Sequence, residues 1–91
     1  MPIPVSASAV TMPSAKALEA EILRQVKDRG AGKTICPSEV ARAFAEDWRP
    51  LMPKVRDVAA DLLARGEIAV TQRGAPVDPL TATGPIRLGL R

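Results

Sequence analysis

Residues 48–70 read WRPLMPKVRDVAADLLARGEIAV, and the spacing of their apolar side chains changes partway along. At 100° per residue, the first part places its apolar residues in one broad sector of a helix: Trp48, Leu51, Met52, Val55, Val58, Ala59, Leu62 and Leu63. Pro50 and Pro53 must lie in or just before the first turn, because proline breaks a helix interior. We therefore predict a helix that begins near Asp47 or Trp48 and stops at Gly66.

After this helix, apolar residues recur at every second position of the sequence. Ile68 opens an alternating run that predicts a half-exposed strand, and the run from Ile86 to Leu90 predicts another. A long loop, residues 72–85, separates them. Within it, Asp78 followed by Pro79 is a pair that can cap a single helical turn. Loops of this length are usually functional or mobile.

Two helices and a short strand are predicted upstream. Ser14 is a good N-cap for a first helix that ends at Gly30, and one stripe of that helix is apolar: Ala15, Leu18, Ile22 and Val26. Residues 34–36 are β-prone and are followed by Pro37, which favours a first helical turn. We predict a second helix from Pro37 to Phe44 that buries Val40, Ala41 and Phe44.

This order of elements is that of a winged helix-turn-helix. The predicted fold class is α+β, with three helices and a small three-stranded antiparallel sheet in the order α-β-α-α-β-wing-β. Residues 14–91 are predicted to form one winged-helix domain, and residues 1–13 a flexible Pro/Ser/Ala tail. Since the longest apolar runs are far shorter than the roughly 20 residues of a membrane-spanning helix, we expect a cytoplasmic protein without a membrane partner.

The composition of the 91 residues excludes several kinds of chemistry. The chain has no histidine, and Cys36 is its one cysteine. A structural zinc site, histidine acid–base catalysis and an internal disulfide are therefore excluded. Cys36 stands before a helix, where a thiol is activated, but without a partner a capping or buried thiol is the simpler interpretation. We expect no enzymatic activity, no catalytic residue, no cofactor and no metal.

The charge balance permits nucleic acid without requiring it. The chain carries 13 Lys+Arg against 10 Asp+Glu, a net charge of +3. This surplus is scattered along the sequence, and no basic tail or long basic run is present.

Four separated motifs resemble a known family. They are KTICPSEVAR (residues 33–42), WRPLMPKVR (48–56), TQRGAPVDP (71–79) and GPIRL (84–88). Together they resemble a small bacterial domain-of-unknown-function family with a winged-helix-like fold, over about residues 15–90. The resemblance implies the fold and leaves the function open, since a fold does not determine a function.

Duplex DNA is the first partner that we predict. In helix-turn-helix proteins the second helix of the pair enters the major groove, where arginine can pair with guanine and lysine can meet phosphate. The third helix and the loop supply most of the candidates, and the second helix adds two that would contact the DNA backbone, Ser38 and Arg42. The other candidates are Arg49, Lys54, Arg56, Gln72 and Arg73. Asp57 and Asp61 point outward on the same helix and would repel phosphates.

Two other interpretations stay open at this stage. Arg49 and Arg56 are also consistent with solvated or salt-bridged groups, and Arg56 could stack on Trp48. Alternatively the domain is a protein-interaction or dimerisation module of the same fold that does not bind DNA. The surfaces that could serve this role combine prolines and small residues: Pro50, Pro53, Ala60, Ala64 and the loop from Pro76 to Pro85.

Overall fold

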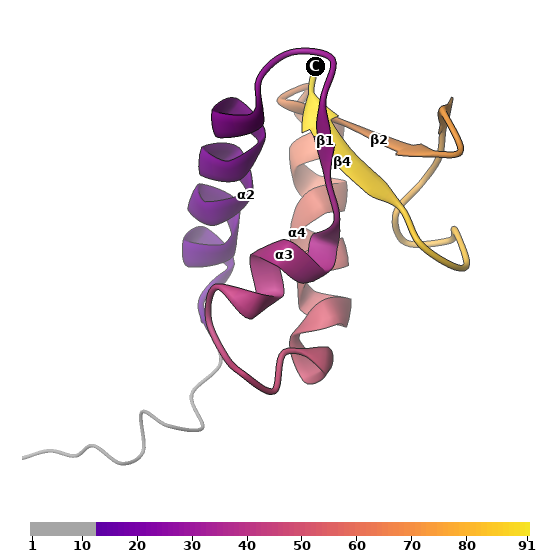
Figure 1. The fold of residues 1–91 in the computed structure, drawn as a ribbon. Coiled ribbons are helices and arrows are strands. Elements are labelled where there is room, and N and C mark those ends of the chain that lie inside the picture. Colours follow the sequence, from indigo (N-terminus) through magenta and orange to yellow (C-terminus); the bar gives the residue numbers. More distant parts are fainter. Residues whose placement is uncertain (1–12) are drawn as a thin grey trace, which may run out of the picture.

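The computed structural model describes residues 13–91. The predicted tail of residues 1–13 therefore lies, except for Pro13, outside the described part. Along the described residues the elements are α2 (Ala15–Arg29), β1 (Thr34–Ile35), α3 (Pro37–Arg42), the 3₁₀ turn η1 (Arg49–Leu51), α4 (Met52–Ala64), β2 (Ile68–Gln72), β3 (Ala75–Pro76) and β4 (Arg87–Leu90). This part of the chain is α+β, with three α-helices beside one antiparallel sheet (Figure 1).

Helix α2 has the two caps that its sequence predicts. The Ser14 hydroxyl accepts a hydrogen bond from the amide of Ala17 at 3.1 Å, which satisfies one of the free donors of the first turn. At the other end Gly30 has φ +90° and donates its N–H to the carbonyl of Val26. The predicted stripe is buried except for Ala15, which is exposed. Ala15 lies in the first turn of α2, at the edge of the contact between α2 and α4.

Helix α3 is shorter than predicted, and this changes the position of Phe44. Pro37 is in its first turn, and the carboxylate of Glu39 accepts a hydrogen bond from the Cys36 amide at 2.8 Å. The helix ends at Arg42, and the next amides bond three residues back, from Phe44 to Ala41 at 3.0 Å. This tighter turn moves Phe44 off the buried stripe. Our prediction that Phe44 is a core residue was wrong, since it is 38% exposed.

The long helix begins later than predicted. Trp48 and Arg49 belong to the 3₁₀ turn and its cap, and the α-helix starts at Met52. Pro50 and Pro53 each occupy a first-turn position, where a proline removes no hydrogen bond. The predicted stop at Gly66 is confirmed by a Schellman motif, in which Glu67 donates to Leu62 and Gly66 to Leu63, each at 2.9 Å.

The sheet has four strands in the order β1-β4-β2-β3, all antiparallel. Our prediction of three strands was wrong, because β3 forms a hairpin with β2 inside the predicted loop. Arg73 and Gly74, the two turn residues, have φ values of 54° and 83°, as a mirror-image hairpin turn requires. Pro76 fits in β3 because this is an edge strand, where a missing N–H is tolerated.

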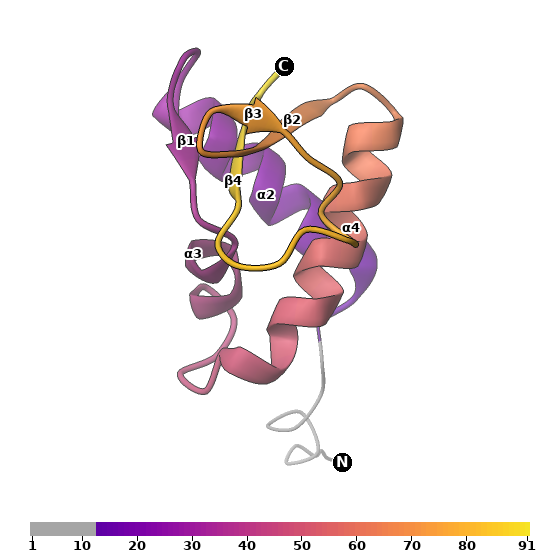
Figure 2. The same cartoon turned by 90° about the vertical axis from the view of Figure 1, so that its right-hand side faces the viewer.

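One face of the sheet and two helices enclose the core. Helices α2 and α4 cross each other and pack on the same face, and α3 closes one end (Figures 1 and 2). The fully or nearly fully buried apolar residues come from all of these elements: Leu18, Ile22, Val26, Ile35, Val40, Ala41, Leu51, Val55, Val58, Ala59, Leu62, Ile68, Val70, Ile86 and Leu88.

Candidate interaction surface

The segment between β3 and β4 folds back onto α4. Figure 2 shows it running from the hairpin to α4 and then returning to β4. As its sequence predicts, Asp78 caps a single turn: its side chain accepts from the Leu80 amide at 2.8 Å, and its carbonyl accepts from the Ala82 amide at 2.9 Å. Pro79 is buried, whereas Leu80 is 59% exposed and lines the surface beside α4. The loop is therefore an ordered cover on one side of α4.

Arg56 fixes this loop to α4. Its guanidinium donates hydrogen bonds to the carbonyls of Pro79 at 3.2 Å, Ala82 at 2.9 Å and Gly84 at 2.6 Å. A planar group with five N–H donors can serve several carbonyls at once, which lysine cannot do in the same way. The alternative in which Arg56 stacks on Trp48 was therefore wrong. A DNA contact by Arg56 would have to compete with three intramolecular bonds.

Gln72, another predicted DNA contact, holds the same loop from the other side. Its amide nitrogen donates to the carbonyls of Thr83 at 2.6 Å and Pro85 at 3.0 Å. Together Arg56 and Gln72 supply donors to five carbonyls between Pro79 and Pro85. The sequence gives no local sign of this arrangement, because the carbonyls that accept are up to 28 positions away.

Two other predicted DNA contacts, Arg42 and Arg49, lie over the ring of Trp48. The guanidinium carbon of Arg42 lies 4.8 Å from the indole centroid, and that of Arg49 lies 4.7 Å from it. Both distances are within the range of a cation–π interaction. Trp48 itself is half-buried against the core. The structure thus brings Arg42 and Arg49 together at the junction of α3 and α4, with both side chains still exposed.

The three remaining candidates are spread over different parts of the fold. Arg73 is exposed at the tip of the β2–β3 hairpin. Lys54 lies in a shallow hollow whose other walls include Glu19, Asp57 and Asp61. Ser38 donates a hydrogen bond from its hydroxyl to the sulfur of Cys36 at 3.1 Å. The seven predicted contacts therefore form no single continuous group.

Carboxylates dominate the exposed face of α4. Asp57 and Asp61 are both exposed, as predicted. Beyond the end of the helix, Arg65 lies 2.9 Å from Glu19, 3.2 Å from Asp61 and 3.3 Å from Glu67. The hydrogen bond to Glu19 and the neighbouring carboxylates raise the pKa of Arg65 above its ordinary value, and the three ion pairs place its guanidinium within this acidic cluster.

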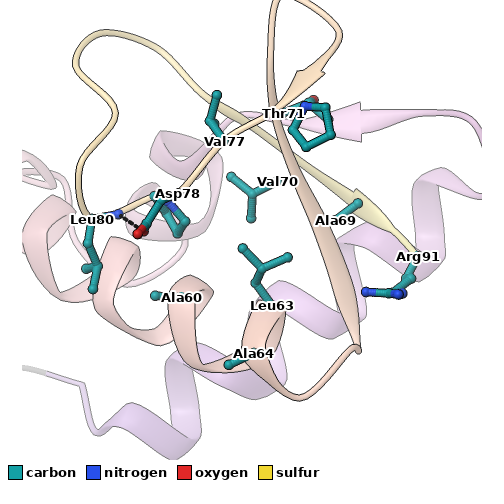
Figure 3. A pocket seen from close by; sticks show the side chains of 12 residues that line it. Ala60, Leu63, Ala64, Ala69, Val70, Thr71, Val77, Asp78, Leu80 and Arg91 are labelled. Atoms are coloured by element: carbon teal, nitrogen blue, oxygen red, sulfur yellow. Dashed lines mark hydrogen bonds between the residues drawn. The ribbon is translucent and has the colours of Figure 1, made fainter.

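An open apolar groove lies beside α4, and Figure 3 shows the residues that line it. Its volume is about 710 Å³. Helix α4 and strand β2 form two walls, and the loop after β3 forms the third. The helix and the strand contribute Ala60, Leu63, Ala64, Ala69, Val70 and Thr71. The only charged side chains on its lining, within residues 13–91, are those of Asp78 and Arg91.

Part of this groove agrees with the surface that the sequence predicts for protein contacts. Ala60, Ala64 and the start of the Pro76–Pro85 segment lie on one lining, whereas Pro53 belongs to an adjacent hollow with Arg56 and Leu80. The contribution of β2 could not be predicted, because it depends on where the hairpin turns toward the helix.

The described residues offer no cluster suited to metal binding: among them no three Cys, Asp or Glu side chains are placed to share an ion. In the same residues no helix is both long enough and apolar enough to span a bilayer. Cys36 is half-buried at the start of α3.

The fold and the surface define a small α+β domain that combines a helix pair with a β-hairpin. More specifically, the chain belongs to the family described as Protein of unknown function (DUF3253), which it matches over residues 15–91. The match includes every element from α2 to β4. No curated protein matches the chain.

Proposed function

We propose that the domain is a non-catalytic protein-interaction module that binds its partner in the groove between α4, β2 and the loop after β3. The observation that carries this proposal is the groove itself, an apolar concavity of about 710 Å³ on a chain of only 91 residues. Exposed apolar surface rimmed by polar residues marks protein interaction sites and ligand-binding grooves.

The order of elements supports a winged helix as the scaffold of this module. The helices α3 and α4 correspond to the helix-turn-helix pair, and the β2–β3 hairpin with the loop after it corresponds to the wing. In this interpretation the wing lies against α4, where Arg56 holds it. The wing therefore creates the groove and at the same time covers part of the helix that would enter DNA.

A crosslinking experiment with a matched control tests the groove. A photoreactive benzoylphenylalanine replaces Ala64, which lines the groove, or Ala20, which is exposed on α2 away from it. We expect a nuclease-resistant crosslink to a protein from position 64 and none from position 20 in the cells of origin. Equal crosslinking from both positions, or none from either, would contradict the proposal.

Duplex DNA is the second candidate partner, and the exposed guanidinium groups of Arg42, Arg49 and Arg73 favour it. None of the three pairs with a carboxylate within residues 13–91. A hairpin tip and a helix junction are places from which phosphates can be reached. The carboxylates of Asp57 and Asp61 oppose this function, since each repels the phosphate backbone.

The DNA candidate is tested by duplex binding at several salt concentrations. Arg73→Ala should weaken binding and reduce the salt slope by about one unit, and Asp57→Asn should strengthen binding. Arg24→Ala serves as a control, because Arg24 is already paired with Glu21 at 2.6 Å. Absence of binding to any duplex at low salt would eliminate this candidate.

A further inference from the structure

We propose that the groove binds a second copy of this chain, in a two-fold symmetric dimer in which Leu80 of each copy enters the groove of the other. This inference rests on the proposed function, because it assigns the occupant of the same groove. Three features of the described residues lead to it: an exposed apolar side chain at the rim, a helix wall that carries two alanines, and two charges of opposite sign.

The exposed side chain is that of Leu80. The large apolar residues exposed in residues 13–91 are Leu80, at 59%, and Phe44, at 38%. Leu80 is held by its neighbours, since its amide donates to Asp78 at 2.8 Å and the Pro79 carbonyl accepts from Arg56 at 3.2 Å. A side chain presented on an ordered turn loses less conformational entropy on binding than one on a mobile loop.

The α4 wall of the groove leaves room for such a side chain. Ala60 and Ala64 are one helical turn apart on α4, and Leu63 and Val70 lie between this helix and β2 (Figure 3). Because the side chains of Ala60 and Ala64 are single methyl groups, this wall is low and leaves the space of about 710 Å³ open. A leucine from a second copy would bury its own surface and theirs in one contact, and buried apolar area is the main source of association energy.

The charges on the lining are self-complementary. Asp78 lies beside Leu80 at one side of the groove and Arg91 lies beyond β2 at the other (Figure 3). In a two-fold interface, if residue i of one copy contacts residue j of the other, then j of the first contacts i of the second. Asp78 of each copy would therefore face Arg91 of the other, which gives two ion pairs.

Two molecules with a net charge of +3 repel each other. The groove adds nothing to this repulsion, because its acidic and its basic residue cancel. Complementary charges of this kind fix the relative orientation of two partners more than they add affinity.

Sedimentation velocity over a wide range of concentrations tests the dimer. We expect purified protein to approach twice the chain mass of 9.6 kDa as the concentration rises. Leu80→Ser should raise the dimer dissociation constant by at least about tenfold. Phe44→Ser is the matched control, because it removes the other exposed apolar side chain, which does not line the groove, and should leave the constant unchanged.

Charge substitutions test the orientation. Asp78→Asn removes the charge but keeps the side-chain oxygen that accepts from the Leu80 amide, and Arg91→Gln removes its proposed partner. Each should weaken the dimer, and the double variant should be no weaker than the single ones. Additive effects of the two substitutions would overturn the predicted pairing.

The outcomes separate this inference from the proposed function. If purified protein is a monomer at every concentration while position 64 still crosslinks to another protein, the dimer is refuted and the interaction module stands. An intramolecular crosslink from position 64 to residues 1–12 would also refute the dimer, because it would show that the chain fills its own groove. If position 64 gives no crosslink and the protein is monomeric, both proposals fail.

Discussion

The guanidinium of Arg56 lies 2.6 Å from the carbonyl oxygen of Gly84, which is 28 positions further along the chain. Through this bond and two others, α4 determines the path of the loop that carries Asp78 and Leu80. The wall of the groove therefore depends on a side chain that the sequence presents as an ordinary helix-surface arginine.

Arg56→Ala is expected to release the loop from α4. Hydrogen bonds to a charged group contribute about 1.5–3 kcal/mol, and Arg56 is half-buried, so we expect a loss of unfolding free energy in that range. Chemical denaturation measures this loss, and amide hydrogen exchange should accelerate at Ala82 and its neighbours in the loop.

Arg56→Lys and Lys54→Ala are the controls for this prediction. Lysine keeps the charge but cannot reach three carbonyls with the same planar group, so Arg56→Lys should be intermediate. Lys54 has no hydrogen bond or ion pair within residues 13–91, so Lys54→Ala should change stability little. Equal effects of Arg56→Ala and Lys54→Ala would show that Arg56 does not fix the loop.

Gln72→Ala is expected to act on the same loop from the hairpin side. It removes donors to the carbonyls of Thr83 and Pro85, and each such bond between exposed neutral groups contributes about 0.5–1.5 kcal/mol. Because Gln72 and Arg56 hold one segment, the double variant should deviate from additivity by about 0.5 kcal/mol or more. If the double variant loses as much unfolding free energy as the two single variants together, the two residues act on separate structures.

Local patterns predicted the three helices and some of their ends, although α3 ends earlier and α4 begins later than predicted. Contacts between distant segments were not predictable. Ser14, Gly30 and Gly66 mark their helix ends through bonds that span only a few residues. The hydrogen bonds of Arg56 and Gln72 depend instead on carbonyls of a loop whose path no local sequence pattern predicts. Both were therefore assigned to DNA, although the structure gives them partners within the chain.

The candidate surface was also predictable from local sequence only in part. Helical geometry predicted the outward positions of Ala64 and Asp57, and both are exposed, whereas Ala60, predicted with them, is half-buried. The groove was not predictable, because it forms only where β3 pairs with β2 and the chain then turns back to α4. Phe44 shows that prediction from local sequence can also fail at a helix end, since two 3₁₀-type hydrogen bonds at the end of α3 are enough to move Phe44 to the surface.

Glu21 is expected to make the stability of α2 depend on pH. The bidentate hydrogen bonds from Arg24 lower the pKa of Glu21 below its ordinary value of 4.5. A carboxyl group whose pKa is lower in the folded state contributes stability above its unfolded pKa and loses it as the pH falls through the folded pKa. We therefore expect wild-type protein to lose stability below about pH 4.5, measured by urea denaturation at a series of pH values.

Glu21→Gln removes this titration, so part of the acid-induced loss should disappear in that variant. Arg24→Gln should reduce the loss in a similar way, because the pKa of Glu21 is then no longer lowered by its main partner. The effect should be small, since the Arg24 side chain is 64% exposed and water screens the pair. Identical pH profiles for wild type and Glu21→Gln would contradict the prediction.

Gly89→Ala is expected to destabilise the sheet where β4 passes between β1 and β2. A Cβ at this position would lie 3.0 Å from the carbonyl oxygen of Lys33 and 3.2 Å from the Cγ2 methyl of Thr34. Thr34 cannot easily yield, because Arg87 donates to its hydroxyl at 3.0 Å and to its carbonyl at 3.1 Å. Overpacking of this kind costs about 1–3 kcal/mol, which thermal or chemical denaturation would detect.

Thr34→Ser provides the diagnostic second substitution. It removes the methyl group nearest the new Cβ but keeps the hydroxyl that Arg87 contacts. We expect it to restore part of the stability lost in Gly89→Ala, and not all, because the Lys33 carbonyl still lies within 3.0 Å. Since glycine to alanine otherwise stabilises a chain by about 0.4–1 kcal/mol where the backbone permits it, a Gly89→Ala variant that is more stable than wild type would show that β1 and β4 separate freely at this point.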